Sequence, residues 1–155
     1  MSRKTISKKR LPTIDIKYKS YLVSLLIQRV LKSGKKTLAQ NLIYKTFNII
    51  RDKTNKNPLI VFEIAIKNAR PLLEVKTKRI GGSTYRIPIE VNSFRSINLA
   101  IRWIINHAHK RVGRGTCVKL ASEIIDTANN SSLTVKKKEE THKNAEANKA
   151  FSHFQ

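Results

Sequence analysis

Apolar residues recur at helical spacing along most of the chain, and short breaks separate the helices that they predict. From residue 18 to residue 31 the apolar side chains fill one half of a helical wheel. Gly34 follows at a position where helices often end on a left-handed residue. A second apolar face runs through residues 38–50. The pattern therefore predicts two helices near the start of the chain.

A third predicted helix begins at Asn57 and Pro58, with the asparagine as its cap and the proline in the first helical position. Residues 59–69 are apolar almost all round, which predicts that this helix lies at the centre of the fold. Two further helices, each with one apolar face, are predicted over residues 93–110 and 118–128.

The last predicted helix, over residues 134–151, is rich in Lys, Glu, Asn and Ala and has almost no apolar face. Such a helix is stable against a partner or through side-chain ion pairs, rather than by packing into a core.

Residues 73–91 alternate between apolar and polar positions, which predicts a two-stranded β-hairpin. We predict a three-residue loop at Gly81, Gly82 and Ser83, because a two-residue loop would place apolar side chains opposite Glu74 and Lys76. The predicted pairs across the strands are Leu73 with Val91, Val75 with Ile89, Thr77 with Ile87, Arg79 with Tyr85, and Lys78 with Arg86.

Together these elements predict a mainly α fold. It is a single domain of about six helices over residues 15–155, with a two-stranded β-hairpin arm projecting at about residues 73–91. Residues 1–14 contain basic residues and no acidic one. They are predicted to form a basic flexible extension that becomes ordered on a polyanion.

The charge of the chain indicates the class of its partner. There are 32 Lys and Arg against 10 Asp and Glu, a formal net charge of +22. Such an excess repels itself in a compact body unless a polyanion neutralises it. Binding to a membrane surface would need a basic helix face opposite a large apolar one, and the apolar helices here carry few basic residues. We therefore predict nucleic acid as the partner, and no membrane.

Cysteine usage and the apolar runs agree with this prediction. Cys117 is the only cysteine, so the chain cannot form an internal disulfide, which suits a reducing compartment. No apolar run reaches the roughly 18 residues of a membrane span. The first residues lack the apolar stretch of a secretory signal.

Several basic groups could bind a phosphate backbone. In the predicted hairpin, Lys78 and Arg86 would repel each other unless a phosphate lay nearby, and Tyr85 offers a ring for a base or ribose. In helix 93–110, Arg95 and Arg102 lie two turns apart, which suits two separate phosphates. The alternative is that the basic residues of the hairpin and of helix 93–110 are ordinary solvent-exposed residues with no RNA contact.

Two more basic segments complete the set. Glycines in loop 110–115 let backbone N–H groups approach phosphates. The lysines of residues 136–138 stand in a first helical turn, where the helix dipole favours anions, so an external anion or the neighbouring Glu139 and Glu140 would have to offset them. The predicted RNA-binding residues are Arg3, Lys4, Lys8, Lys9, Arg10, Lys35, Lys36, Lys76, Lys78, Arg79, Tyr85, Arg86, Arg95, Arg102, Lys110, Arg111, Arg114, Lys136, Lys137, Lys138 and Lys143.

Catalytic and metal-binding patterns are weak. Residues 34–37 resemble the end of a phosphate-binding loop, but Lys36 replaces the magnesium-binding Ser or Thr, and a helix precedes them instead of a strand. Glu139 and His142 have metal-ligand spacing, yet bundle di-iron sites need two such pairs. We predict no enzyme, no catalytic residue, no metal and no cofactor. There are two alternatives. A sequence-specific DNA-binding protein should show a helix-turn-helix or a dimer seam, and neither is evident. An RNA-processing enzyme should show a cluster of His and Asp or a metal site, which is not evident either.

Four motifs in order resemble the family of small-subunit ribosomal protein S-seven. They are LKSGKK at 31–36, EVKTKRIGGSTYRIP at 74–88, LAIRW at 99–103, and KKEETHK at 137–143 with AEANKAF at 145–151. The resemblance runs from about residue 15 to residue 154 and supports the mainly α fold with a hairpin arm.

The resemblance implies a structural protein of the ribosome in translation. Members bind the 3′ major domain of small-subunit rRNA, nucleate head assembly beside neighbouring ribosomal proteins, and place the hairpin near the exit-site tRNA and the mRNA. By position it implies an arm role for Lys76, Lys78, Arg79, Tyr85 and Arg86, and rRNA docking for Lys35, Lys36, Arg95, Arg102 and residues 136–138. The tip of the hairpin and the Lys, Ile and Asn bias resemble a plastid-encoded member, and a bacterial ribosome is the alternative.

Overall fold

The computed structural model describes residues 12–154, which form six α-helices, a β-hairpin and a closing 3-10 helix. The mainly α fold with a hairpin arm is thereby confirmed. The elements are α1 (Tyr21–Val30), α2 (Lys36–Thr54), α3 (Pro58–Ala69), β1 (Leu73–Ile80), β2 (Ser83–Glu90), α4 (Ser93–Lys110), α5 (Thr116–Ala128), α6 (Leu133–Ala147) and η1 (Lys149–Phe154).

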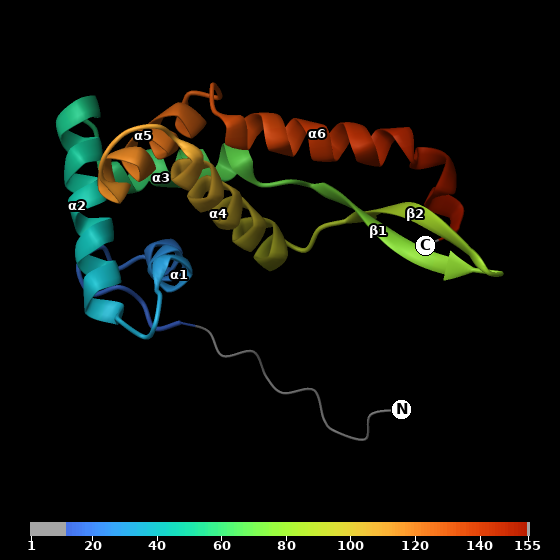
Figure 1. Cartoon of the computed structure of the whole chain (residues 1–155), viewed down its shortest axis with the longest axis horizontal. Helices are drawn as coiled ribbons and strands as arrows, with labels where there is room; N and C mark the ends of the chain where they lie inside the picture. The colour runs from blue at the N-terminus through green and yellow to red at the C-terminus, as the bar shows by residue number, and fades with distance from the viewer. Residues whose placement is uncertain (1–11, 155) are drawn as a thin grey trace, which may run out of the picture.

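Figure 1 shows two parts of unlike shape. Helices α1 to α5 gather into a body, and the hairpin extends from it with α6 running alongside. Buried side chains from all five helices form one core, in which the rings of Phe47 and Phe62 lie 5.7 Å apart. α5 packs against α2, α3 and α4. Helix α3, predicted to be central, contacts α2, α4, α5 and α6, but it leaves Ile60 and Ile64 exposed.

Short polar side chains cap the starts of α3 and α4, as predicted for α3. The side chain of Asn57 accepts a hydrogen bond from the Leu59 N–H at 3.0 Å, and Pro58 is the first helical residue. Asn92 caps α4 in the same way through Phe94, at 3.1 Å. Helix α4 therefore begins at Ser93 and runs to Lys110, as the sequence predicts.

The first helix starts and ends differently from the prediction. Tyr18 lies in a turn before α1, which starts at Tyr21, because the Asp15 carboxylate accepts the Tyr18 N–H at 3.0 Å and closes the turn. The other oxygen of Asp15 accepts the Tyr44 hydroxyl proton at 2.8 Å. Burial, and then this hydrogen bond, raise the pKa of Tyr44 to about 12. Gly34 has a left-handed φ of 73°, but it lies in the loop beyond the end of α1 at Val30.

The last helix packs on the arm, which explains its weak apolar face. α6 contacts both strands, and η1 packs on β2. The Nε2 atom of His142 accepts the Leu72 N–H at 3.0 Å, so this side chain joins α6 to the base of the arm. The predicted helix to residue 151 is shorter: α6 ends at Ala147, and the chain continues as η1.

The turn of the arm also differs from the prediction. Ile80 pairs with Ser83, so the loop is the two-residue Gly81–Gly82 and the predicted three-residue loop is wrong. The two glycines have φ of 56° and 88°. Positive φ at both positions defines a turn whose twist matches that of the two strands.

Two features stabilise this register. It places Pro88 opposite Val75. Opposed residues of antiparallel strands alternate between hydrogen-bonded and non-hydrogen-bonded pairs, and this pair is of the second kind, so the missing N–H of proline is not needed. It also places Glu74 opposite Ile89, and this carboxylate accepts two hydrogen bonds from Arg95 at 2.7 and 2.9 Å. The acidic residue that disfavoured this register in the sequence is therefore paired from outside the hairpin.

Candidate nucleic-acid interface

The observed register redistributes the basic residues of the arm. Residues opposite each other in antiparallel strands share a face, so Lys78 lies with Tyr85, and Arg86 lies with Thr77 on the other face. Lys78 and Arg86 consequently do not face each other, so their predicted pairing is wrong, while a phosphate contact of either residue stays a prediction. Arg79 lies on the face of Arg86, because it is two residues from Thr77.

Tyr85 already has an aromatic neighbour. Its ring is half-buried and lies 5.5 Å from that of Phe151 in η1, centroid to centroid. The C-terminal segment therefore covers part of the ring that the sequence offers to a base. Lys76 and Lys78 share this face of the hairpin and are exposed.

The predicted arginine stripe of α4 lines a groove against α1. The groove has a volume of about 480 Å³ and is lined by Arg29, Arg95 and Arg102, with Phe94 beside them. Arg29 donates a hydrogen bond to the Asn98 side chain at 3.1 Å, which holds its guanidinium against α4. Arg29 is not among the predicted RNA-binding residues; its signal in the sequence is a basic residue in the last turn of α1.

Arg95 keeps its charge in this groove while it pairs with Glu74. The hydrogen bonds to that carboxylate, followed by its charge, raise the pKa of Arg95. The arginine thus joins the base of the arm to α4, in addition to any contact that it makes with an external anion.

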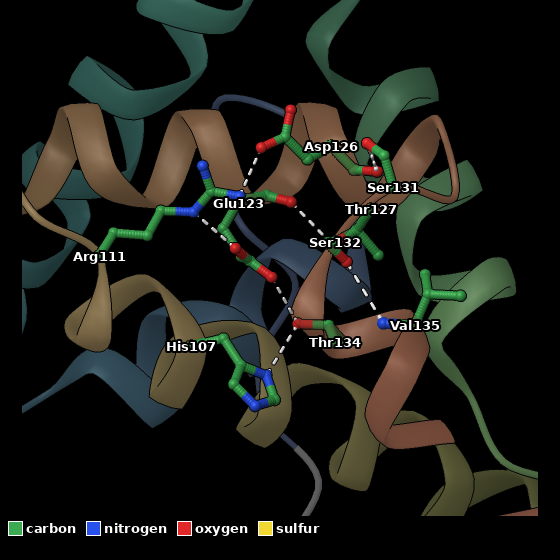
Figure 2. A network of polar contacts seen from close by, with 9 residues as sticks. All are labelled: His107, Arg111, Glu123, Asp126, Thr127, Ser131, Ser132, Thr134 and Val135. Atoms are coloured by element: carbon green, nitrogen blue, oxygen red, sulfur yellow. Dashed lines mark hydrogen bonds and ion pairs between the residues drawn. The ribbon is translucent and has the colours of Figure 1, made fainter. Parts of the chain in front are cut away.

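Arg111 lies in the basic loop after α4 but points into the protein (Figure 2). Its Nε donates to the Glu123 carboxylate at 2.6 Å, and its Nη2 donates to Asp126 at 2.5 Å. Burial lowers the pKa of Arg111, but the hydrogen bonds to Asp126 and Glu123 outweigh this and raise it. The structure thus gives Arg111 internal partners, whereas Arg114 in the same loop is exposed.

The network around Arg111 connects three helices. Glu123 in α5 is only 1% exposed, and its second oxygen accepts the Thr134 hydroxyl proton at 2.6 Å. Thr134 in α6 also lies 3.1 Å from the His107 Nδ1 of α4. Figure 2 shows these side chains converging from α4, α5 and α6. The network therefore fixes the start of α6, from which the helix runs along the arm.

The remaining predicted residues lie at several places. Lys137 pairs with Glu140 at 2.9 Å, so an internal partner offsets part of the charge in the first turns of α6. Lys138 is half-buried. The exposed ones are Lys35, Lys36, Lys110, Lys136 and Lys143. Arg3, Lys4, Lys8, Lys9 and Arg10 lie outside the described residues.

Among residues 12–154, no cluster of three or more His, Cys, Asp or Glu side chains could hold a metal ion. Across that stretch, no helix combines the length and apolar composition that crossing a bilayer requires.

Comparison with known proteins identifies the family. The family model of ribosomal protein S7p/S5e matches residues 2–149. The chain is 63% identical over 143 residues to small ribosomal subunit protein uS7c of Trieres chinensis, covering 92% of this chain and 90% of that protein. It is 48% identical over 154 residues to small ribosomal subunit protein uS7 of Thermosynechococcus vestitus, covering 99% of both. An arginine-lined groove, a basic arm and these matches agree: the chain belongs to the ribosomal protein S7p/S5e family.

Proposed function

We propose that this chain binds the 3′ major domain of small-subunit rRNA and nucleates assembly of the subunit head. Family membership makes it a structural constituent of the small ribosomal subunit, acting in translation. The finer proposal adds neighbouring proteins of the head as partners and places the arm near exit-site tRNA and mRNA. It requires no catalytic step and no small-molecule substrate.

The balance of charge is the observation that carries the proposal. With 32 basic and 10 acidic side chains, the carboxylates of this chain are too few to pair one to one with its basic residues. Some of the few carboxylates are already engaged inside the fold: Glu74 with Arg95, and Glu123 with Arg111. An external polyanion is therefore the natural source of neutralising charge, and folded rRNA supplies it.

The geometry supports binding to a folded RNA. The groove between α1 and α4 presents Arg29, Arg95 and Arg102 together, and arginine forks match phosphate oxygens. The basic strands of the arm project from the body at a separate place (Figure 1). Contacts at two places on one protein suit a partner with a defined tertiary shape better than a uniform duplex.

We place the protein in the plastid ribosome. The chloroplast form uS7c of Trieres chinensis is 63% identical to it, and cyanobacterial uS7 proteins are also similar, at 48% and 49% identity. A bacterial ribosome is the alternative.

Sedimentation tests the proposed function. A tagged copy of the full chain, expressed in a plastid-bearing host, is expected to sediment with small ribosomal subunits. It should be released by monovalent salt more easily than by non-ionic detergent, because phosphate contacts dominate the binding. A tagged basic protein of equal charge from outside the ribosome is the control. A chain that stays at the top of the gradient with this control would contradict the proposal.

A further inference from the structure

A second groove lies between α4 and α6, and its α4 residues follow those of the arginine-lined groove along the helix. It has a volume of about 670 Å³. α4 lines it with Trp103, His107 and Lys110, and α6 lines it with Lys137 and Glu140. Positions 103, 107 and 110 share one side of a helix, so α4 presents all three side chains together.

Trp103 is the only tryptophan of the chain, and it is half-buried at this groove. The neighbouring apolar residues Ile101 and Ile104 are fully buried in the core, so the tryptophan is not needed to fill the interior there. An aromatic ring beside lysines provides a surface on which a nucleobase can stack. Such stacking contributes about 1–3 kcal/mol per base and accepts any base.

The network of Figure 2 fixes the hydrogen-bonding role of His107 in this groove. The Glu123 carboxylate only accepts hydrogen bonds, so the Thr134 hydroxyl must donate to it at 2.6 Å. The oxygen of Thr134 therefore accepts from His107 Nδ1, 3.1 Å away, and Nδ1 carries the proton. Burial lowers the pKa of His107, which favours the neutral ring. The second ring nitrogen is then an acceptor, and Figure 2 shows it pointing away from Thr134.

The charge of the groove is suited to a single nucleotide. Lys110 is exposed at the end of α4, where it can meet a phosphate. Lys137 is held by Glu140 at 2.9 Å, so a phosphate would have to compete with this carboxylate. Lys110 and the partly neutralised Lys137 together carry too little positive charge to bind a continuous run of phosphates.

We propose that the groove between α4 and α6 binds one unstacked nucleotide of the rRNA, whose base stacks on Trp103. The phosphate of the nucleotide meets Lys110, and an N–H of the base or the ribose hydroxyl donates to His107. This inference rests on the proposed function, because it takes the partner to be RNA, and it adds a binding site for a nucleotide that is splayed out of its helix.

The emission of the single tryptophan provides the test in the intact protein. A labelled transcript of the 3′ major domain reports binding by its anisotropy, while Trp103 emission and its quenching by acrylamide report the groove. Binding is expected to change the emission and to shield the ring from acrylamide. Trp103→Ala is expected to weaken binding roughly 5- to 150-fold, and Trp103→Phe, which keeps a stacking ring, should lose much less.

The outcomes separate the two proposals. Thermal unfolding of both variants checks that they fold, and the emission measurement on the unmodified chain needs no substitution at all. If the transcript binds while emission and acrylamide quenching stay unchanged, the groove proposal is overturned and the proposed function stands. If the transcript does not bind, the proposed function itself fails.

Discussion

Replacing Arg111 by alanine is expected to lower the free energy of unfolding by about 3–5 kcal/mol, although Arg111 belongs to a loop of basic residues. The reason is the Glu123 carboxylate, which is 1% exposed and would lose its 2.6 Å partner. A buried charge without its partner costs far more than a surface ion pair contributes. For a chain of this size the melting temperature should fall by roughly 10 °C.

Two further variants make this prediction specific. Arg114→Ala changes an exposed arginine of the same loop and should leave the melting temperature almost unchanged. Adding Glu123→Gln to Arg111→Ala should restore part of the stability, because a neutral amide costs less to bury than an unpaired carboxylate. Equal melting temperatures for Arg111→Ala and Arg114→Ala would show that the ion pairs of Arg111 with Glu123 and Asp126 do not stabilise the fold.

Neutralising the arm is expected to weaken RNA binding without unfolding the body. Arg79→Gln with Arg86→Gln removes two guanidinium groups from one face of the hairpin. Affinity for the 3′ major domain transcript should drop about 10-fold or more, since a hydrogen bond to a charged group contributes about 1.5–3 kcal/mol. The plot of log affinity against log salt should become shallower by about 1.5, because each lost phosphate contact removes roughly 0.7–0.9 from the slope.

The opposite face of the hairpin supplies the matched control. Lys76→Gln with Lys78→Gln removes the same charge from the face that also carries Tyr85. Comparing the two double variants shows which face meets the RNA. Unchanged affinity and salt slope in both would contradict a role for the arm in binding, and loss of helical circular dichroism in either would mean that the arm is structural.

Local signals in the sequence predicted most of the fold. Asn57 and Pro58 start α3 as expected, because a capping side chain and a proline act within one helical turn. The bounds of α4 could be predicted for a similar reason, since its apolar face repeats without interruption. The apolar composition of α3 predicted its contacts with four other helices but not the exposure of Ile60 and Ile64, because composition does not reveal which side of a helix its neighbours leave open.

The wrong register of the arm and the unforeseen partner of Arg111 have long-range causes. The observed register is stabilised in part by Arg95, which pairs with Glu74 from 21 positions along the chain. The basic loop predicts an RNA contact for Arg111, which stays a prediction, but it does not reveal the internal partner Glu123, which lies on the next helix. The sequence gives no spacing rule that would have paired them. Arg29 and Trp103 were missed because each becomes part of a groove only once a second helix packs beside it.

The central claim is that the basic residues of this helical body are arranged for one folded RNA and do not merely attract any polyanion. Equilibrium binding at near-physiological salt measures this most directly, with the full chain titrated into transcripts of the 3′ major domain and the 5′ domain of small-subunit rRNA. An unrelated protein of equal net charge serves as the comparison. We expect the chain to bind the 3′ major domain at least about 100-fold more tightly than the 5′ domain, while the comparison protein binds both alike. Equal affinity of the chain for the two transcripts, matching that of the comparison protein, would contradict the claim.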